Sequence, residues 1–75
     1  MNGTEEIVLN IAIRVLNNTY LTLDDIIFDE KMDSLMYLNL IVELEEAFGI
    51  EIEDEVLFSD QIESLRDLIE IISIN

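Results

Sequence analysis

The feature that most restricts the fold of this chain is an amphipathic run from Leu35 to Phe48. Its apolar residues recur at the three- and four-residue spacing of an α-helix, and no proline interrupts it. Asp33, a good N-cap residue, precedes the run. We therefore predict a helix with Ser34 in its first turn, at the surface, beside free backbone N–H groups. Such a position favours an anionic phosphate ester.

The apolar residues of this run fall into two sectors when each residue is turned by about 100°. The expected core face contains Tyr37, Leu40, Ile41, Leu44, Ala47 and Phe48. The second sector lies closer to Ser34, contains Leu35, Leu38 and Val42, and is bordered by Asn39, Glu43, Glu45 and Glu46. An exposed apolar strip with an acidic border is typical of a docking surface. A wider core face for the apolar residues, and a solvated surface for the acids, are the alternatives.

Three further helical segments are expected. The first spans roughly residues 5 to 17, with Thr4 as its cap and Asn17-Asn18 at its end. A short helix capped by Asp54 carries Val56, Leu57 and Phe58. The last spans about residues 65 to 73, after a capping box in which Ser64 is followed three residues later by Asp67.

Two segments are expected to be loops. Residues 19–32 have no sustained period but many apolar side chains, which we expect to pin a long loop to the core with a turn of helix after Thr22: Tyr20, Leu21, Leu23, Ile26, Ile27 and Phe28. Gly49 is expected to end the helix in the left-handed conformation, and Ile50 and Ile52 then point inward from an extended loop. The predicted fold class is therefore all-α, a small bundle of three main helices and one short helix in a single domain over residues 1–75.

Composition limits the function classes. The 75 residues include neither cysteine nor histidine, which removes thiolate nucleophiles, imidazole acid–base catalysis and the commonest zinc ligands. The net charge of −15 repels nucleic acid and anionic membranes and favours a basic patch on another protein. We expect a monomeric binding protein rather than an enzyme, located in the cytoplasm because the acidic N-terminus is unlike a signal peptide.

The residues around Ser34 carry a resemblance to a known family. Asp33-Ser34-Leu35 is followed by a hydrophobic helix, the triplet Leu44-Glu45-Glu46, then Phe48 and the exit Gly49-Ile50-Glu51-Ile52. This pattern resembles the attachment region of carrier proteins, the acyl and peptidyl carriers, in which the serine of Asp-Ser-Leu bears a 4′-phosphopantetheine arm. The resemblance runs more loosely over the whole chain. It implies an acyl-carrier-protein-like bundle.

The resemblance also implies a function. A phosphopantetheinyl transferase, with Mg²⁺, transfers the arm from coenzyme A to Ser34, with Asp33 and Leu35 completing the cofactor-binding motif. The arm then holds an acyl or aminoacyl group as a thioester. Ligases that load the cargo, and synthases or transferases with basic docking patches, are the implied partners. The implied partner-binding residues are Leu35, Leu38, Val42, Glu43, Glu45 and Glu46.

The chain departs from the fatty-acid carriers at three positions. Those carriers usually have glycine where this chain has Lys31, and acids where it has Met36 and Asn39. A dedicated carrier of a specialised pathway, for a polyketide-type acyl group or an amino acid, is therefore at least as well supported as a fatty-acid carrier. The alternative outside the family is an acidic helical interaction module whose serine is not modified.

Overall fold

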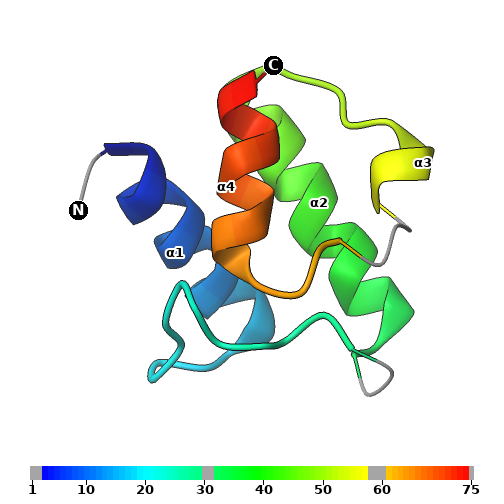
Figure 1. The fold of residues 1–75 in the computed structure, drawn as a ribbon. Helices are drawn as coiled ribbons and strands as arrows, with labels where there is room; N and C mark the ends of the chain where they lie inside the picture. The colour runs from blue at the N-terminus through cyan, green and yellow to red at the C-terminus, as the bar shows by residue number, and fades with distance from the viewer. Residues whose placement is uncertain (1–2, 30–31, 58–60, 75) are drawn as a thin grey trace.

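The computed structural model describes residues 3–29, 32–57 and 61–74, and these ranges contain four helices and no strand. They are α1 (Gly3–Leu16), α2 (Ser34–Phe48), α3 (Asp54–Leu57) and α4 (Leu65–Ile74). Helix α1 packs against both α2 and α4, and α3 lies at the edge of the bundle on the segment that follows α2 (Figure 1). The all-α bundle of three main helices and a short one is confirmed. No described helix is long and apolar enough to cross a bilayer.

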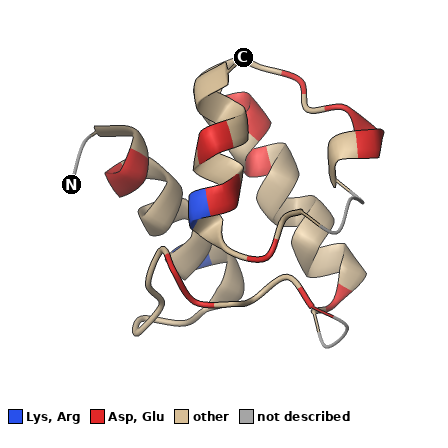
Figure 2. Ribbon diagram, in the orientation of Figure 1, with Lys and Arg blue, Asp and Glu red and all other residues tan. Residues whose placement is uncertain are grey.

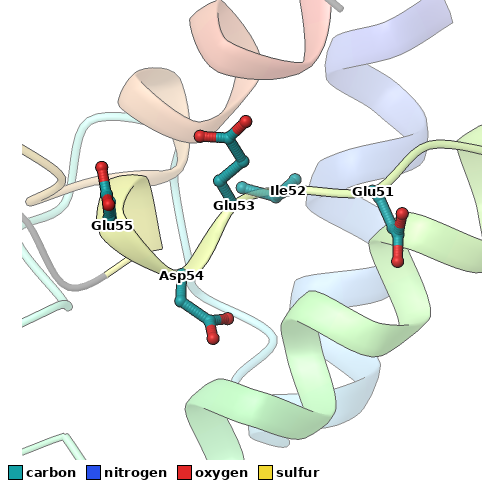
Figure 3. A pocket seen from close by; sticks show the side chains of 5 residues that line it. All are labelled: Glu51, Ile52, Glu53, Asp54 and Glu55. Carbon is teal, nitrogen blue, oxygen red and sulfur yellow. The ribbon is translucent and has the colours of Figure 1, made fainter.

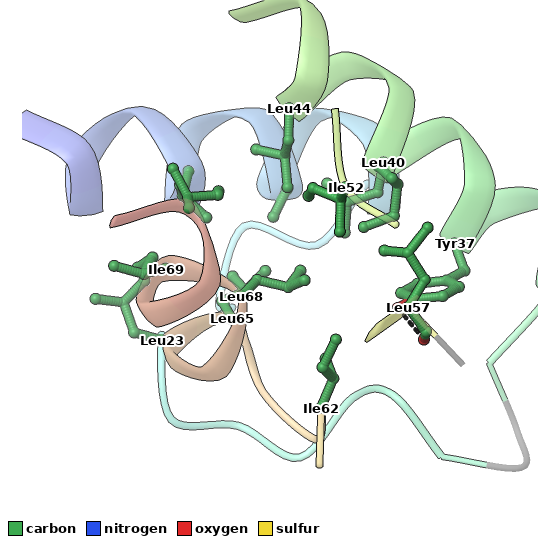
Figure 4. Close-up of a cluster of buried hydrophobic side chains, with 14 of the residues drawn as sticks. Leu23, Tyr37, Leu40, Leu44, Ile52, Leu57, Ile62, Leu65, Leu68 and Ile69 are labelled. Carbon is green, nitrogen blue, oxygen red and sulfur yellow. Dashed lines mark hydrogen bonds between the residues drawn. The ribbon is translucent and has the colours of Figure 1, made fainter. Parts of the chain in front are cut away.

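One hydrophobic core joins all four helices and both long connections (Figure 4). Its centre is made of side chains with no exposed surface, which include Leu40 and Leu44 of α2 and Leu65 and Leu68 of α4. The other buried apolar residues are Val8, Ala12, Leu21, Leu23, Tyr37, Ile41, Ile52, Leu57, Ile62, Ile69 and Ile72. The predicted core face of α2 is confirmed for its four buried residues and for the partly buried Phe48. It is wrong for Ala47, which is exposed at the last turn.

The helix ends follow the local sequence in most places. Asn17 has a φ of 53° and Gly49 a φ of 65°, so both predicted left-handed stops are confirmed. At the start of α4, the Asp67 carboxylate accepts hydrogen bonds from the Ser64 N–H at 3.1 Å and the Glu63 N–H at 2.9 Å. The acid of the predicted capping box therefore bonds back to the chain before the helix, as expected.

Two predicted caps are wrong. Helix α1 begins at Gly3, so Thr4 lies inside its first turn. Helix α3 begins at Asp54, and the carbonyl oxygen that accepts from the Val56 and Leu57 N–H groups belongs to Glu53. Phe58, which was expected on this short helix, lies outside the described residues.

The connection from α1 to α2 is less completely buried than predicted. Leu21 and Leu23 are buried in the core, but Tyr20 is 90 % and Ile26 60 % exposed. Thr22 is followed by a turn rather than by helix, because its N–H donates to the Asp25 carboxylate at 3.0 Å. Side chains that anchor this connection thus alternate with side chains that it presents to solvent.

Candidate functional site

Asp33 and Ser34 start α2 as the sequence predicts. Asp33 has an extended backbone (φ −66°, ψ 125°), and its carboxylate accepts a hydrogen bond from the Leu35 N–H at 2.8 Å. The Asp33 carbonyl accepts the first helical hydrogen bond, from the Tyr37 N–H at 3.0 Å. Ser34 is therefore the first helical residue, and it is exposed. The cap fixes the backbone that carries the hydroxyl without using the hydroxyl.

The first turn of α2 differs from the first turns of the other helices. Helix α1 has Glu5 and Glu6 there, α3 has Asp54 and Glu55, and α4 has Asp67, whereas α2 has no acid after its cap. Within the described residues, the backbone N–H groups of Ser34 and Met36 have no acceptor. The positive end of the α2 dipole is thus left available to an anion attached at Ser34.

The base of α2 is held by Tyr37. Its hydroxyl donates to the Leu57 carbonyl oxygen at 2.7 Å (Figure 4), and its ring lies 5.1 Å from the Phe28 ring, centroid to centroid, at 56°. Burial raises the pKa of the Tyr37 phenol, because an ionised phenolate is poorly solvated there. One side chain one turn below the cap therefore joins the incoming connection, α2 and α3.

Backbone hydrogen bonds fix the connection that leads to Ser34. The N–H groups of Ile27 and Phe28 both donate to the Glu63 carbonyl, at 2.9 and 3.1 Å, and the Arg66 N–H donates to the Leu23 carbonyl at 3.0 Å. The approach to the serine is consequently anchored on the start of α4. This arrangement depends on residues far apart in the sequence, and no local pattern indicates it.

Ion pairs add to the same junction. The Arg66 guanidinium binds the Asp24 carboxylate, with its shortest contact at 2.6 Å, and reaches Glu5 at 3.2 Å. Its hydrogen bond holds the pKa of the Asp24 carboxyl below the ordinary 3.8. Arg66 therefore connects α1, the α1–α2 connection and α4.

The predicted second sector of α2 is exposed. Leu35 is 71 %, Leu38 41 % and Val42 49 % exposed, so the alternative of a wider core face is wrong for all three. On the other side of Asp33, a groove of about 330 Å³ is partly lined by Ile26 and Met36. The sequence did not single out these two as surface residues. Ile26, predicted to pin the connection to the core, is 60 % exposed, and Met36, which belongs to neither predicted sector of α2, is 38 % exposed.

The three acids beside that strip differ in their contacts. The Glu43 carboxylate pairs with Arg14 of α1 at 2.7 Å. The Glu45 carboxylate accepts from the Ile52 N–H at 2.8 Å, and its carbonyl accepts from the Gly49 and Ile50 N–H groups, so Glu45 organises the exit from α2. Glu46 is exposed. Two of the three thus have intramolecular partners that spacing alone did not indicate.

Comparison with known proteins agrees with this geometry. The model of a family described as the phosphopantetheine attachment site matches residues 6–72, which include the cap, all of α2 and both connections. Neither the search of curated proteins nor the search of solved structures found a significant match. Members of this family carry covalently attached 4′-phosphopantetheine and serve biosynthetic enzymes without being catalysts themselves. The chain belongs to the phosphopantetheine-attachment family and is a phosphopantetheine-carrying carrier protein.

Proposed function

We propose that Ser34 is the serine that carries the phosphopantetheine arm. The observation that carries this proposal is the position of Ser34. It is exposed and directly follows the Asp33 cap, and among the described helices α2 alone has no acid in its first turn. A phosphodiester on Ser34 would place its negative charge beside the free N–H groups of Ser34 and Met36. Asp33 and Leu35 hold this turn through their hydrogen bond, which is the cofactor-binding role we assign to them.

The other serines support Ser34 by contrast. Ser64 lies within the matched residues, but it is 7 % exposed, and its N–H and hydroxyl both face the Asp67 carboxylate. Ser73 is exposed but lies near the end of α4, beyond the matched residues. Ser59 lies outside the described residues. Of the described serines, Ser34 alone combines exposure with a helix N-terminus.

The modification is a phosphoryl-type transfer. The Ser34 oxygen attacks the phosphorus next to pantetheine in coenzyme A, and the bond to the adenosine bisphosphate half breaks. The serine proton passes to a base of the transferase, which with Mg²⁺ supplies the catalysis. Once attached, the arm contributes a thiol, which forms a thioester with the cargo. This chain has no cysteine of its own, so the arm is the source of that thiol.

Partner enzymes are proposed to dock on the exposed strip of Leu35, Leu38 and Val42. These side chains flank the attachment turn, so an enzyme that covers them reaches the arm. Negative charge beside this strip comes from the exposed Glu46 and the partly exposed Glu43 and Glu45. This charge attracts basic docking patches and accelerates association. The expected partners are a phosphopantetheinyl transferase, a loading ligase and synthase or transferase enzymes. We propose that each binds a monomeric carrier that forms a single domain over residues 1–75.

The cargo is proposed to come from a specialised pathway. Met36 and Asn39 stand at positions of α2 where the fatty-acid carriers have acids, and both are exposed here. Partners of the fatty-acid type would therefore lack two charged contacts. We propose an acyl group of polyketide type or an amino acid as cargo. The test gives the modified protein to fatty-acid enzymes and to ligases that load polyketide-type acyl groups or amino acids, and compares the rates at which each loads the arm.

The test of the attachment site is intact mass after incubation with coenzyme A, Mg²⁺ and a broad-specificity phosphopantetheinyl transferase. The wild type is expected to gain one phosphopantetheine group, whereas Ser34→Ala gains none. Ser73→Ala, an exposed serine elsewhere, is the matched control and should be modified as the wild type is. Modification of Ser34→Ala would assign the site to another residue. No modification of folded wild type by several transferases would favour the unmodified interaction module.

A further inference from the structure

A second apolar groove lies at the other end of the bundle from Ser34, between the segment after α2 and the last turns of α4. Four of its lining residues are aliphatic, Ile52, Val56, Ile71 and Ile74, and its volume is about 340 Å³. Ile74 is 86 % exposed. Glu51 and Ile52 follow the C-terminal end of α2, whose 15 residues span about 22 Å at about 1.5 Å per residue, whereas Val56 lies on α3, whose Leu57 carbonyl bonds to Tyr37.

Acidic side chains border this groove. Glu51 and Glu53 line it directly, and Asp54 and Glu55 follow on α3. Figure 3 shows the four carboxylates spread around Ile52, with Glu53 pointing toward α4 and Glu51 and Asp54 pointing to the opposite side. All four acids are exposed, and none forms an ion pair with a described residue.

Positive charge is confined to other parts of the described chain. Arg14 pairs with Glu43, and Arg66 pairs with Asp24 and Glu5. Figure 2 shows the two blue positions on α1 and at the start of α4, while red positions alternate with tan ones along the segment that leads into α3 and the first half of α3 is red. Glu51 and Glu53 line the groove beside the exposed Ile74 without pairing with a described cation, so their mutual repulsion opposes folding.

The charge also limits what can cover the groove. A second copy of the chain carries the same charge of −15 and the same acids, so it is repelled. Anionic lipid surfaces are repelled for the same reason. A basic amphipathic helix is complementary, because its aliphatic face enters the groove while lysine or arginine side chains reach the carboxylates.

We propose that this groove is a second docking site, and that it binds a basic amphipathic helix of a partner protein. The site is separate from the strip on α2 and does not depend on modification of Ser34. A protein bound there holds the carrier by one end and leaves Ser34 exposed to an enzyme at the other. The carrier can then be tethered to one protein while another acts on its cargo.

The test uses a synthetic peptide of leucine and lysine, patterned as an amphipathic helix, titrated into the isotope-labelled full chain. The amide signals of residues 51–57 and 71–74 are expected to shift and to saturate independently of any shifts at the start of α2. A peptide with glutamate in place of lysine should not bind. Shifts confined to α2 would overturn the proposal.

Matched variants separate the groove from general electrostatics. Ile74→Ser is expected to weaken peptide binding about tenfold, because an exposed aliphatic contact is lost without loss of core. Leu35→Ser removes another exposed aliphatic side chain, on α2, and this variant and Glu46→Gln should leave binding at the groove unchanged. The double variant Glu51→Gln with Glu53→Gln should weaken binding at the groove about fivefold at low salt. Equal weakening by target and control variants would contradict the proposal.

Two further readouts distinguish this proposal from the attachment at Ser34. Ser34→Ala should bind the peptide as the wild type does, and Ile74→Ser should still gain the phosphopantetheine group. Sedimentation of the protein alone should show a monomer. A dimer that Ile74→Ser dissociates would assign the groove to a second copy and overturn the basic helix as its occupant.

Discussion

The two sides of α2 use the same residue type for opposite purposes. Leu40 and Leu38 stand two positions apart, yet Leu40 has no exposed surface and Leu38 is 41 % exposed. The inner side joins α2 to the core and to α3 through Tyr37, while the outer side adds apolar surface next to Ser34. When a helix is apolar on two sides, the burial of each side must therefore be predicted separately: the inner side of α2 packs on the core, and the outer side remains exposed.

The largest expected effect is on the inner side. Leu40→Ala should lower the free energy of unfolding by about 2–5 kcal/mol, because the removed atoms leave a cavity in a fully buried site. Urea denaturation followed by circular dichroism measures the change. A loss similar to that of the exposed Leu35→Ala would show that the inner side does not anchor the helix.

Tyr37→Phe is expected to have the next largest effect. The Leu57 carbonyl loses its donor inside the core, which costs about 1–3 kcal/mol at neutral pH. The folded-state pKa of Tyr37 is raised above the ordinary 10.0, so its contribution is present below that pH and is lost as pH rises through the folded value. The stability difference between variant and wild type should therefore shrink in alkali, and a constant difference up to unfolding would contradict this origin.

On the outer side, Leu38→Ala should change stability by less than about 1 kcal/mol, because much of the side chain is already in water. Its main effect should be weaker binding of the transferase, measured as a higher KM for the carrier. Leu40→Ala serves as the matched change of the same residue type. If Leu38→Ala lowered stability as much as it weakened binding, Leu38 would be a core residue rather than a docking residue.

The smallest expected effect is that of salt on the melting temperature, and it concerns the whole chain rather than one side of α2. Eighteen acidic residues against three basic ones repel one another, so added salt is expected to raise the melting temperature by a few degrees. Scanning calorimetry across a salt titration measures this. A flat or falling melting temperature would mean that the pairs of Arg14 and Arg66 outweigh the repulsion.

Local interactions explain what the sequence predicted well. The Asp33 cap, the Gly49 stop and the Ser64 box each involve residues within one turn, so their spacing is visible in the chain. The exposure of Ile26 and Tyr20 was missed because burial in a long connection depends on where the other helices lie. The partners of Arg66 and Glu45 were missed because many carboxylates and N–H groups were available at similar spacing.

The anchoring of the α1–α2 connection on the start of α4 has a consequence for when the protein matures. Ile27, Phe28 and Leu23 complete their backbone hydrogen bonds only with Glu63 and Arg66. During synthesis these partners emerge after Ser34, so the approach to Ser34 completes its hydrogen bonds only once residues 63–66 have left the ribosome. We therefore expect an enzyme that recognises the folded attachment region to act only on chains that extend through Arg66 and have folded.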